Sequence, residues 1–87
     1  MRVRFSPIAR GALDEIFAYI AVDNPIAAAD LVAHIEQVAL LIGHFPEMGK
    51  RTKRRDVRTF PVGNYILVYE ITHDEVVIHY ARHTARQ

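Results

Sequence analysis

Cysteine is absent from the chain, so no disulfide framework can stabilise it and a reducing compartment is expected. The first residues, Met1–Pro7, lack the apolar segment of a secretory signal. Uncharged stretches such as Gln37–Pro46 are far shorter than the roughly 20 apolar residues that cross a bilayer. These absences predict a cytoplasmic protein with no membrane partner.

Two kinds of ligand site are missing as well. No glycine-rich phosphate loop is present, because the glycines are dispersed at Gly11, Gly43, Gly49 and Gly63. His79 and His83 lie four residues apart in a segment expected to be a strand, which separates them by about 13 Å, too far for one metal ion. We therefore expect neither a cofactor nor a metal site.

What the sequence does contain is enough apolar surface for a core. Hydrophobic residues make up 51% of the 87 residues, which predicts a single domain over residues 1–87. At this size, folding buries somewhat more than about 60% of the surface that an extended chain exposes. Stability should therefore be modest, and a binding partner would add to it.

The net charge of +1 conceals an uneven distribution of charge. Residues 1–49 hold three arginines and six acidic residues, a net −3, whereas residues 50–87 hold eight cations and four acidic residues, a net +4. Six of these cations lie between Lys50 and Arg58, with only Asp56 opposing them. A cluster of that density attracts phosphate or an acidic partner, and a solvated loop is the alternative interpretation.

The first half of the chain predicts a strand and two helices. Val3 and Phe5 alternate with arginines, as in a strand with one apolar face. Ser6-Pro7 combines an N-cap with a first helical residue, and apolar residues recur at helical spacing until about Val22. Asn24-Pro25 repeats this signal and starts a second helix, for which Gly43 is the expected stop.

The second half predicts three strands. Residues 45–56 are expected to form a loop, and the strands are expected at Val57–Phe60, Tyr65–Ile71 and Val76–Arg82. Tyr65–Ile71 is apolar on both faces, which is typical of a central strand. Short connections make these three strands antiparallel. The expected fold is α+β with the order βααβββ, a helical hairpin packed on an antiparallel sheet.

Short motifs occur in a particular order along nearly the whole chain. They are Phe5-Ser6-Pro7, Tyr19-Ile20-Ala21, Asn24-Pro25, Phe45-Pro46-Glu47-Met48-Gly49-Lys50, Val57-Arg58, Gly63-Asn64-Tyr65, Leu67-Val68-Tyr69, and His83 with Arg86. Together they resemble the ParE/RelE superfamily of bacterial type II toxins, and most closely its ParE branch, which includes plasmid stabilisation proteins. The order βααβββ is the fold of that superfamily.

The resemblance implies one of two activities. ParE-like members inhibit DNA gyrase and block replication, whereas RelE-like members are ribonucleases that cleave mRNA in the ribosome. Members of both branches are neutralised by a cognate antitoxin protein. We expect an acidic segment of that antitoxin, or the target, to bind the cationic residues Lys50, Arg51, Lys53, Arg54, Arg55 and Arg86.

If the chain is RelE-like, its catalytic residues would be Arg58, Arg82 and His83. Metal-free RNA cleavage needs a proton-transfer group and cations that stabilise the charged phosphorane. The arginines could hold phosphate, and a histidine exchanges protons near neutral pH. On a continuous strand, however, Arg82 shares a face with Tyr80, and His83 points to the other face.

Ile66 favours the gyrase inhibitor over the ribonuclease. In mRNA-cleaving relatives an arginine often precedes the Leu-Val-Tyr of the central strand, and here Ile66 has that place. Loss of one preorganised charge-stabilising group typically costs about 10² to 10³ in rate. The expected function is therefore a gyrase-directed toxin, with an mRNA interferase acting on ribosome and mRNA as the alternative and a non-toxic interaction module as a second one.

Overall fold

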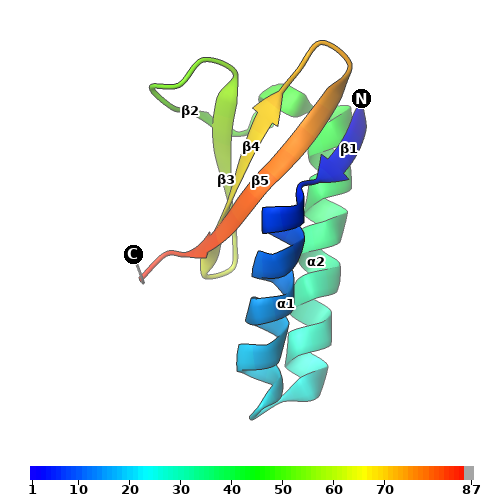
Figure 1. Ribbon diagram of the computed structural model, residues 1–87, viewed down its shortest axis with the longest axis vertical. Helices are drawn as coiled ribbons and strands as arrows, with labels where there is room; N and C mark the ends of the chain where they lie inside the picture. Colours follow the sequence, from blue (N-terminus) through cyan, green and yellow to red (C-terminus); the bar gives the residue numbers. More distant parts are fainter. Residues whose placement is uncertain (86–87) are drawn as a thin grey trace.

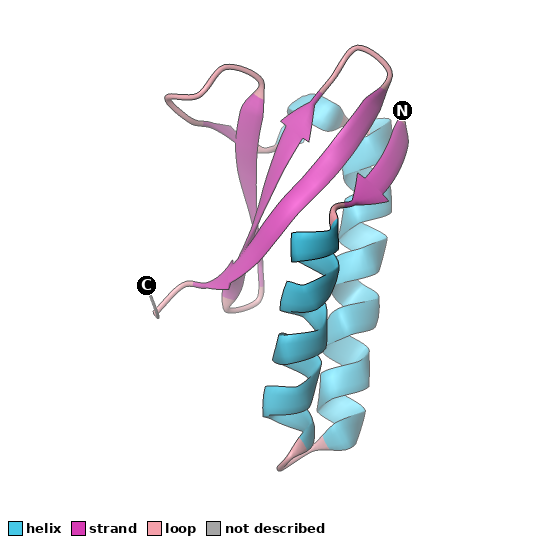
Figure 2. Cartoon of the chain, viewed as in Figure 1, coloured by secondary structure: helices cyan, strands magenta, loops and turns pink. Residues whose placement is uncertain are grey.

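The computed structural model describes residues 1–85, in which two helices form a hairpin beside a five-stranded sheet (Figures 1 and 2). The α+β architecture expected from the sequence is confirmed. Along the chain the elements are β1 (Arg2–Phe5), α1 (Pro7–Ala21), α2 (Pro25–His44), the 3-10 helix η1 (Pro46–Met48), β2 (Lys50–Arg51), β3 (Val57–Val62), β4 (Tyr65–Ile71) and β5 (Glu75–His83).

The sheet has the strand order β1-β5-β4-β3-β2, so β4 is the central strand that its apolar sequence predicted. The antiparallel pairing of β3, β4 and β5 is confirmed. β3 continues to Val62, two residues past the expected end at Phe60. Two features of the strand pairing also differ from the expectation. β1 pairs parallel to β5, with Val3 opposite Val76, so the sheet is mixed rather than wholly antiparallel. Lys50–Arg51, expected within a loop, pairs with β3 as an edge strand.

Both helix starts lie where the capping signals placed them. The Ser6 side chain accepts a hydrogen bond from the Ala9 N–H (3.1 Å), and the Asn24 side chain accepts one from the Ala27 N–H (3.0 Å). A proline follows each cap as the first helical residue, where the missing N–H costs no hydrogen bond. Local sequence therefore determines where each helix of the hairpin begins.

The predicted stop at Gly43 is wrong, because α2 continues through His44. Gly43 is buried and serves close packing instead. A Cβ at this position would lie 2.5 Å from the Val3 Cγ2 atom and 2.7 Å from the Met1 carbonyl oxygen. The Met1 ammonium group donates a hydrogen bond to the Gly43 carbonyl (2.8 Å). Glycine lets the end of α2 lie directly against the first residues of the chain.

The core lies between the hairpin and one face of the sheet. In β4, alternate side chains point to opposite faces. Leu67 and Tyr69 face the helices and are wholly buried together with Ile35 of α2, whereas Ile66 and Val68 are half-buried on the opposite face. We call the face that packs on the helices the inner face and the opposite one the outer face.

The hairpin extends past the sheet at the end where its helices join (Figure 1). Several large apolar side chains near that end are exposed, namely Phe17, Tyr19, Val22 and Ile26. Among residues 1–85, α2 is the one helix that is long and apolar enough to cross a membrane by length and composition, a test that core helices also pass. The length of the uncharged stretches did not mark α2 as such a helix, because Asp30 and Glu36 divide its apolar sequence.

Candidate functional site

Tyr69 fixes the segment that leads from α2 into the cationic residues. Its buried hydroxyl donates a hydrogen bond to the Pro46 carbonyl (2.6 Å) and accepts one from the Gly49 N–H (3.0 Å). A buried tyrosine hydroxyl needs partners, and here both its donor and its acceptor capacity are used on backbone groups. Tyr69 therefore holds both ends of the short helix η1 against the sheet.

Arg58 holds the same segment from β3. Its Nη1 donates hydrogen bonds to the carbonyl oxygens of Glu47 (3.2 Å) and Gly49 (2.9 Å). Arg58 lies opposite Tyr69 in the β3–β4 register, so both side chains project from the inner face. We call Arg58 and Tyr69, together with the segment 46–49 that they bind, the η1 clamp.

The cation loop, which we define as residues 50–55, follows the η1 clamp. Lys50, Arg51, Lys53, Arg54 and Arg55 are all exposed. Thr52 organises the loop, because its hydroxyl donates to the Val57 carbonyl (2.8 Å) and accepts from the Arg54 N–H (3.2 Å). None of the ion pairs formed within residues 1–85 involves a cation of this loop. Its positive charge is therefore directed to solvent.

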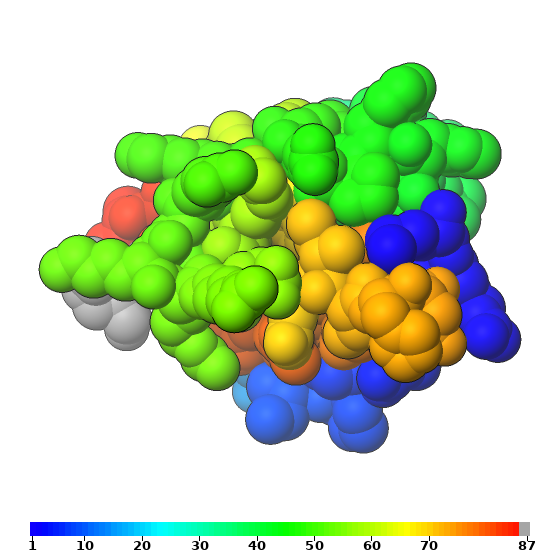
Figure 3. Space-filling view, turned by 90° about the horizontal axis from the view of Figure 1, so that it is seen from above, coloured from blue at the N-terminus to red at the C-terminus, as the bar shows by residue number. Residues whose placement is uncertain are grey.

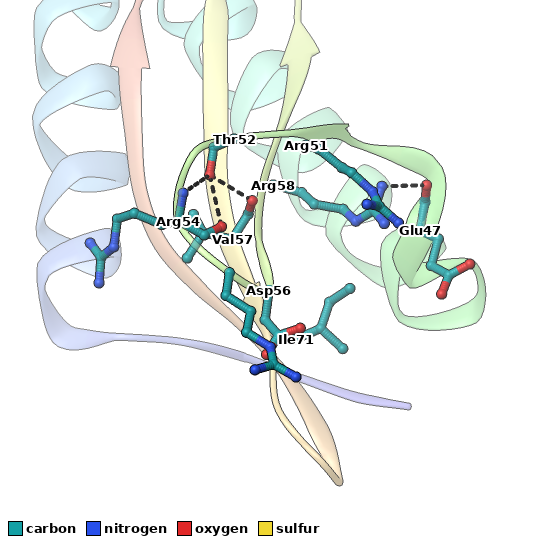
Figure 4. A pocket seen from close by; sticks show the side chains of 9 residues that line it. Glu47, Arg51, Thr52, Arg54, Asp56, Val57, Arg58 and Ile71 are labelled. Atoms are coloured by element: carbon teal, nitrogen blue, oxygen red, sulfur yellow. Dashed lines mark hydrogen bonds between the residues drawn. The ribbon is translucent and has the colours of Figure 1, made fainter.

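A hollow of about 380 Å³ opens beside the cation loop (Figure 4). Arginines dominate its lining, and Glu47 and Asp56 are the acidic residues among them. The arginines are Arg51, Arg54, Arg55 and Arg58. A concave surface lined by cations attracts anionic groups, because field lines concentrate there. The geometry suits carboxylates or phosphates of a partner.

The pKa of Tyr69 predicts a pH dependence of stability. Burial raises this pKa above the ordinary value of 10.0, and the Gly49 hydrogen bond and the Arg58 charge offset the rise only in part. The unfolded chain therefore releases this proton at a lower pH than the folded protein. The stabilisation is complete below pH 10.0 and is lost as the pH rises through the folded-state pKa.

We expect the free energy of unfolding to fall above about pH 10. Denaturant titrations at several pH values would measure this decline, and Tyr69→Phe should make it shallower than in the unsubstituted protein. The absorbance of tyrosinate gives an independent check, since the chain has 4 tyrosines. Ionisation of all of them together at the ordinary pKa would contradict the raised pKa of Tyr69.

The three candidate catalytic residues lie apart. Arg82 pairs with Ile66 and projects from the outer face, as its spacing from Tyr80 predicted. β5 remains extended through His83, so His83 lies on the inner face, with its ring 5.0 Å from that of Tyr65. Arg58 lies opposite Tyr69 of β4, whereas His83 lies opposite Tyr65. Four residues of β4, or about 13 Å, separate these two positions.

The polar contacts of Arg58 and His83 are equally separate. Arg58 binds two backbone carbonyls, and His83 Nδ1 accepts a hydrogen bond from the Ala85 N–H (3.0 Å). Arg86, which we expected to bind a target or antitoxin, lies outside the described residues. The described part of the chain thus does not gather Arg58, Arg82 and His83 around one point.

Two further features of the sheet had no clear sequence signal. His79 Nε2 lies 2.8 Å from Glu70 Oε1, and His79 occupies an irregular position where the β4–β5 register shifts. The sequence did not predict the η1 clamp, because Pro46 and Gly49 indicate a turn without identifying the side chains that hold it.

Within residues 1–85, no three His, Cys, Asp or Glu side chains are grouped closely enough to hold a metal.

Comparisons with known proteins agree with the fold and with the family resemblance of the sequence. The family model described as the ParE toxin of the type II toxin-antitoxin system, parDE, matches residues 3–87. "Putative toxin Y4kP" of Sinorhizobium fredii (strain NBRC 101917 / NGR234) is 33% identical over 79 residues, which are 88% of this chain and 82% of that protein.

Two solved structures share the architecture. The chromosomal ParDE system from P. aeruginosa superposes with a TM-score of 0.81 at 18% identity, covering 95% of each chain. The RelBE2 toxin-antitoxin complex from Mycobacterium tuberculosis has a TM-score of 0.70 at 26% identity, covering 94% of this chain and 95% of that one. With the family match over nearly its full length, this chain belongs to the ParE toxin family and is the toxin of a type II toxin–antitoxin system.

Proposed function

We propose that this toxin inhibits DNA gyrase in the cytoplasm and that a cognate antitoxin neutralises it. ParE-like members of the superfamily act on gyrase, and the family model that matches residues 3–87 is that of ParE. The observation that carries the choice against mRNA cleavage is the separation of Arg58, Arg82 and His83. A phosphoryl-transfer site needs its cations and its proton donor around one reacting phosphate.

Arg58 illustrates why the arrangement is poor for cleavage. Its Nη1 is bound to the carbonyl oxygens of Glu47 and Gly49, so this nitrogen could contact a phosphate only by giving up those two hydrogen bonds of the η1 clamp. Arg82 lies on the opposite face, beside Ile66 rather than beside a second cation of β4. A toxin that works by binding a protein target needs no such constellation, only an accessible surface.

The gyrase proposal predicts a loss of supercoiling activity. We expect purified toxin, shown to be folded by circular dichroism, to inhibit supercoiling of a relaxed plasmid by gyrase and ATP, or to trap cleaved DNA. Addition of the antitoxin should restore supercoiling. Normal supercoiling at a large molar excess of folded toxin would rule out gyrase as the target. Expression without antitoxin should arrest growth, and harmless expression of soluble protein would favour a non-toxic interaction module.

One observation favours mRNA cleavage as a second candidate. Lys50 and Arg82 line a common hollow of about 520 Å³ at the β3 side of the sheet, with Ile66 between the strands that carry them. Two cations on one hollow can hold a phosphate. Toeprinting on translating ribosomes separates the candidates, since a gyrase inhibitor gives no new codon-dependent cleavage.

The cation loop is the surface that we propose for the antitoxin. Its exposed cations, which form no ion pair with another residue of 1–85, attract an acidic segment and speed association. The two solved structures of similar fold come from a ParDE toxin–antitoxin system and from a RelBE2 toxin–antitoxin complex, which supports an antitoxin partner. Arg86 belongs to the same proposal by its charge and its position in the sequence.

A further inference from the structure

A second hollow lies at the end of α2, and its lining is largely apolar. It measures about 520 Å³, and Met1, Phe45, Pro46, Met48 and Ile71 contribute apolar side chains to it. Phe45 is 62% exposed and Met1 is 52% exposed, so large apolar groups at its rim contact water. Clustered exposed apolar side chains mark interaction sites more often than isolated ones do.

This apolar hollow adjoins the cationic one. Glu47 and Ile71 line both, so the apolar surface and the arginines of the cation loop form one continuous face. Figure 3 looks onto this end of the molecule, where the segment after α2 and the cation loop lie side by side with the β4–β5 turn and the first residues of the chain.

The backbone of this surface is held in place without a partner. The η1 clamp fixes Pro46 and Gly49 to Tyr69, and the Met1 ammonium is bound to the Gly43 carbonyl. A preorganised site loses less conformational entropy on binding than a mobile one. Methionine side chains such as Met48 adapt their shape to an inserted group. The surface is therefore suited to accept a side chain.

The charges around this surface identify the occupant. The cation loop presents positive side chains that no ion pair within residues 1–85 neutralises, so carboxylates complement it. The apolar hollow contains the Phe45 ring and the His44 imidazole beside aliphatic and thioether groups. Because most of its apolar lining is aliphatic or thioether, an apolar side chain suits it better than stacked bases, which need aromatic rings. An acidic peptide with a large apolar side chain matches both halves.

We propose that this composite surface binds an acidic peptide segment that inserts one large apolar side chain between Phe45 and Met48 and lays its carboxylates on Arg51, Arg54 and Arg55. This proposal extends the antitoxin-binding role proposed above for the cation loop. It rests on that proposed function in one respect, namely that the antitoxin is the protein that carries the segment. Glu47 lies between the two halves, so its charge opposes carboxylates placed there.

Three synthetic peptides test the proposal with the full chain, labelled with ¹⁵N for amide spectra. One has a leucine flanked by aspartates and glutamates, one has alanine in place of leucine, and one has lysines in place of the acidic residues. We expect the acidic leucine peptide to shift amide signals of both residues 45–49 and the cation loop. The alanine peptide should bind about tenfold to a hundredfold more weakly, because burial of leucine is lost. The lysine peptide should not bind.

Matched variants locate the binding. Phe45→Ala should weaken binding of the acidic leucine peptide about tenfold. Leu40 is exposed to a similar extent (64% against 62% for Phe45), and Leu40→Ala should leave binding unchanged. Reversing Arg54 and Arg55 to glutamate should slow association and reduce its salt dependence, and Arg2→Glu should not. Glu47→Gln should tighten binding. These positions are exposed, so the variants are expected to fold.

Several results would overturn the proposal. They are no shift with the acidic leucine peptide, shifts confined to the hairpin or to the outer face, equal affinity for the leucine and alanine peptides, or equal losses from Phe45→Ala and Leu40→Ala. The gyrase and growth experiments do not enter these measurements. Peptide binding at the predicted residues with normal supercoiling would support the composite surface and reject only the proposed target.

Discussion

Replacing Gly49 by alanine is expected to lower the free energy of unfolding by about 3 kcal/mol. A Cβ at this position would lie 2.5 Å from the Tyr69 hydroxyl and 2.8 Å from the Thr59 carbonyl oxygen. Neither group can withdraw cheaply, because Tyr69 is wholly buried and Thr59 belongs to β3. Relief of the clash would displace Tyr69 from Pro46 and open the η1 clamp. Denaturant unfolding measures the change.

Gly11→Ala is the matched control for this prediction. Nothing lies within 4 Å of a Cβ built at Gly11, which is exposed within α1. Alanine favours helix over glycine by roughly 0.5 to 1 kcal/mol, so this variant should be more stable than the unsubstituted protein. The same substitution thus has opposite signs at the two positions. A loss at Gly49 no larger than the change at Gly11 would refute the packing argument.

Tyr69→Phe is expected to cost about 2 to 3 kcal/mol of stability. The substitution keeps the aromatic ring but removes the hydroxyl that bonds Pro46 O and Gly49 N–H. The Gly49 N–H is buried, and a buried donor without a partner carries its full desolvation cost. Amide exchange should also increase over residues 46–49, because the η1 clamp loses one of its two side chains.

Tyr80→Phe serves as the comparison for Tyr69→Phe. Tyr80 is 41% exposed on the outer face, where water can replace any partner of its hydroxyl. The free energy of unfolding should change by less than about 0.5 kcal/mol in Tyr80→Phe. Equal effects at the two tyrosines would show that the hydroxyl of Tyr69 does not hold η1. The two comparisons together separate packing at Gly49 from hydrogen bonding at Tyr69.

The η1 clamp gives a structural account of motifs that marked the family resemblance. The Pro46–Gly49 turn, Arg58 and Tyr69 lie in three separate stretches of the sequence and meet at one point. Arg58 and Tyr69 bond backbone groups of the Pro46–Gly49 turn. The turn in its place supports the cation loop and forms one wall of the apolar hollow. These residues therefore shape the binding surface, and the exposed arginines and Phe45 are the groups free to contact a partner.

Several parts of the fold were predictable from the sequence because they depend on local interactions. Ser6 and Asn24 bond N–H groups three residues ahead, so each cap is encoded within one helical turn. The apolar segment Tyr65–Ile71 requires burial on both faces and so becomes the central strand. Charge clustering likewise marked the cation loop, since five exposed cations close in sequence stay close in space.

The rest depended on contacts between distant residues. β1 pairs with β5 across more than seventy positions of sequence, as Arg2 opposite Glu75 shows, and no local pattern encodes a parallel partner. Gly43 looked like a helix stop, and only the position of Met1 and Val3 explains why it must be small.

The sequence by itself determined the order of elements, the helix starts, the central strand and the charged segment. Tertiary structure alone decided that Arg58 binds carbonyls, that β5 stays extended through His83, and that an apolar hollow adjoins the cation loop. The physical reason is that helix caps and strand alternation are set by neighbours along the chain. The direction and partner of a functional side chain are set by whichever distant element packs against it.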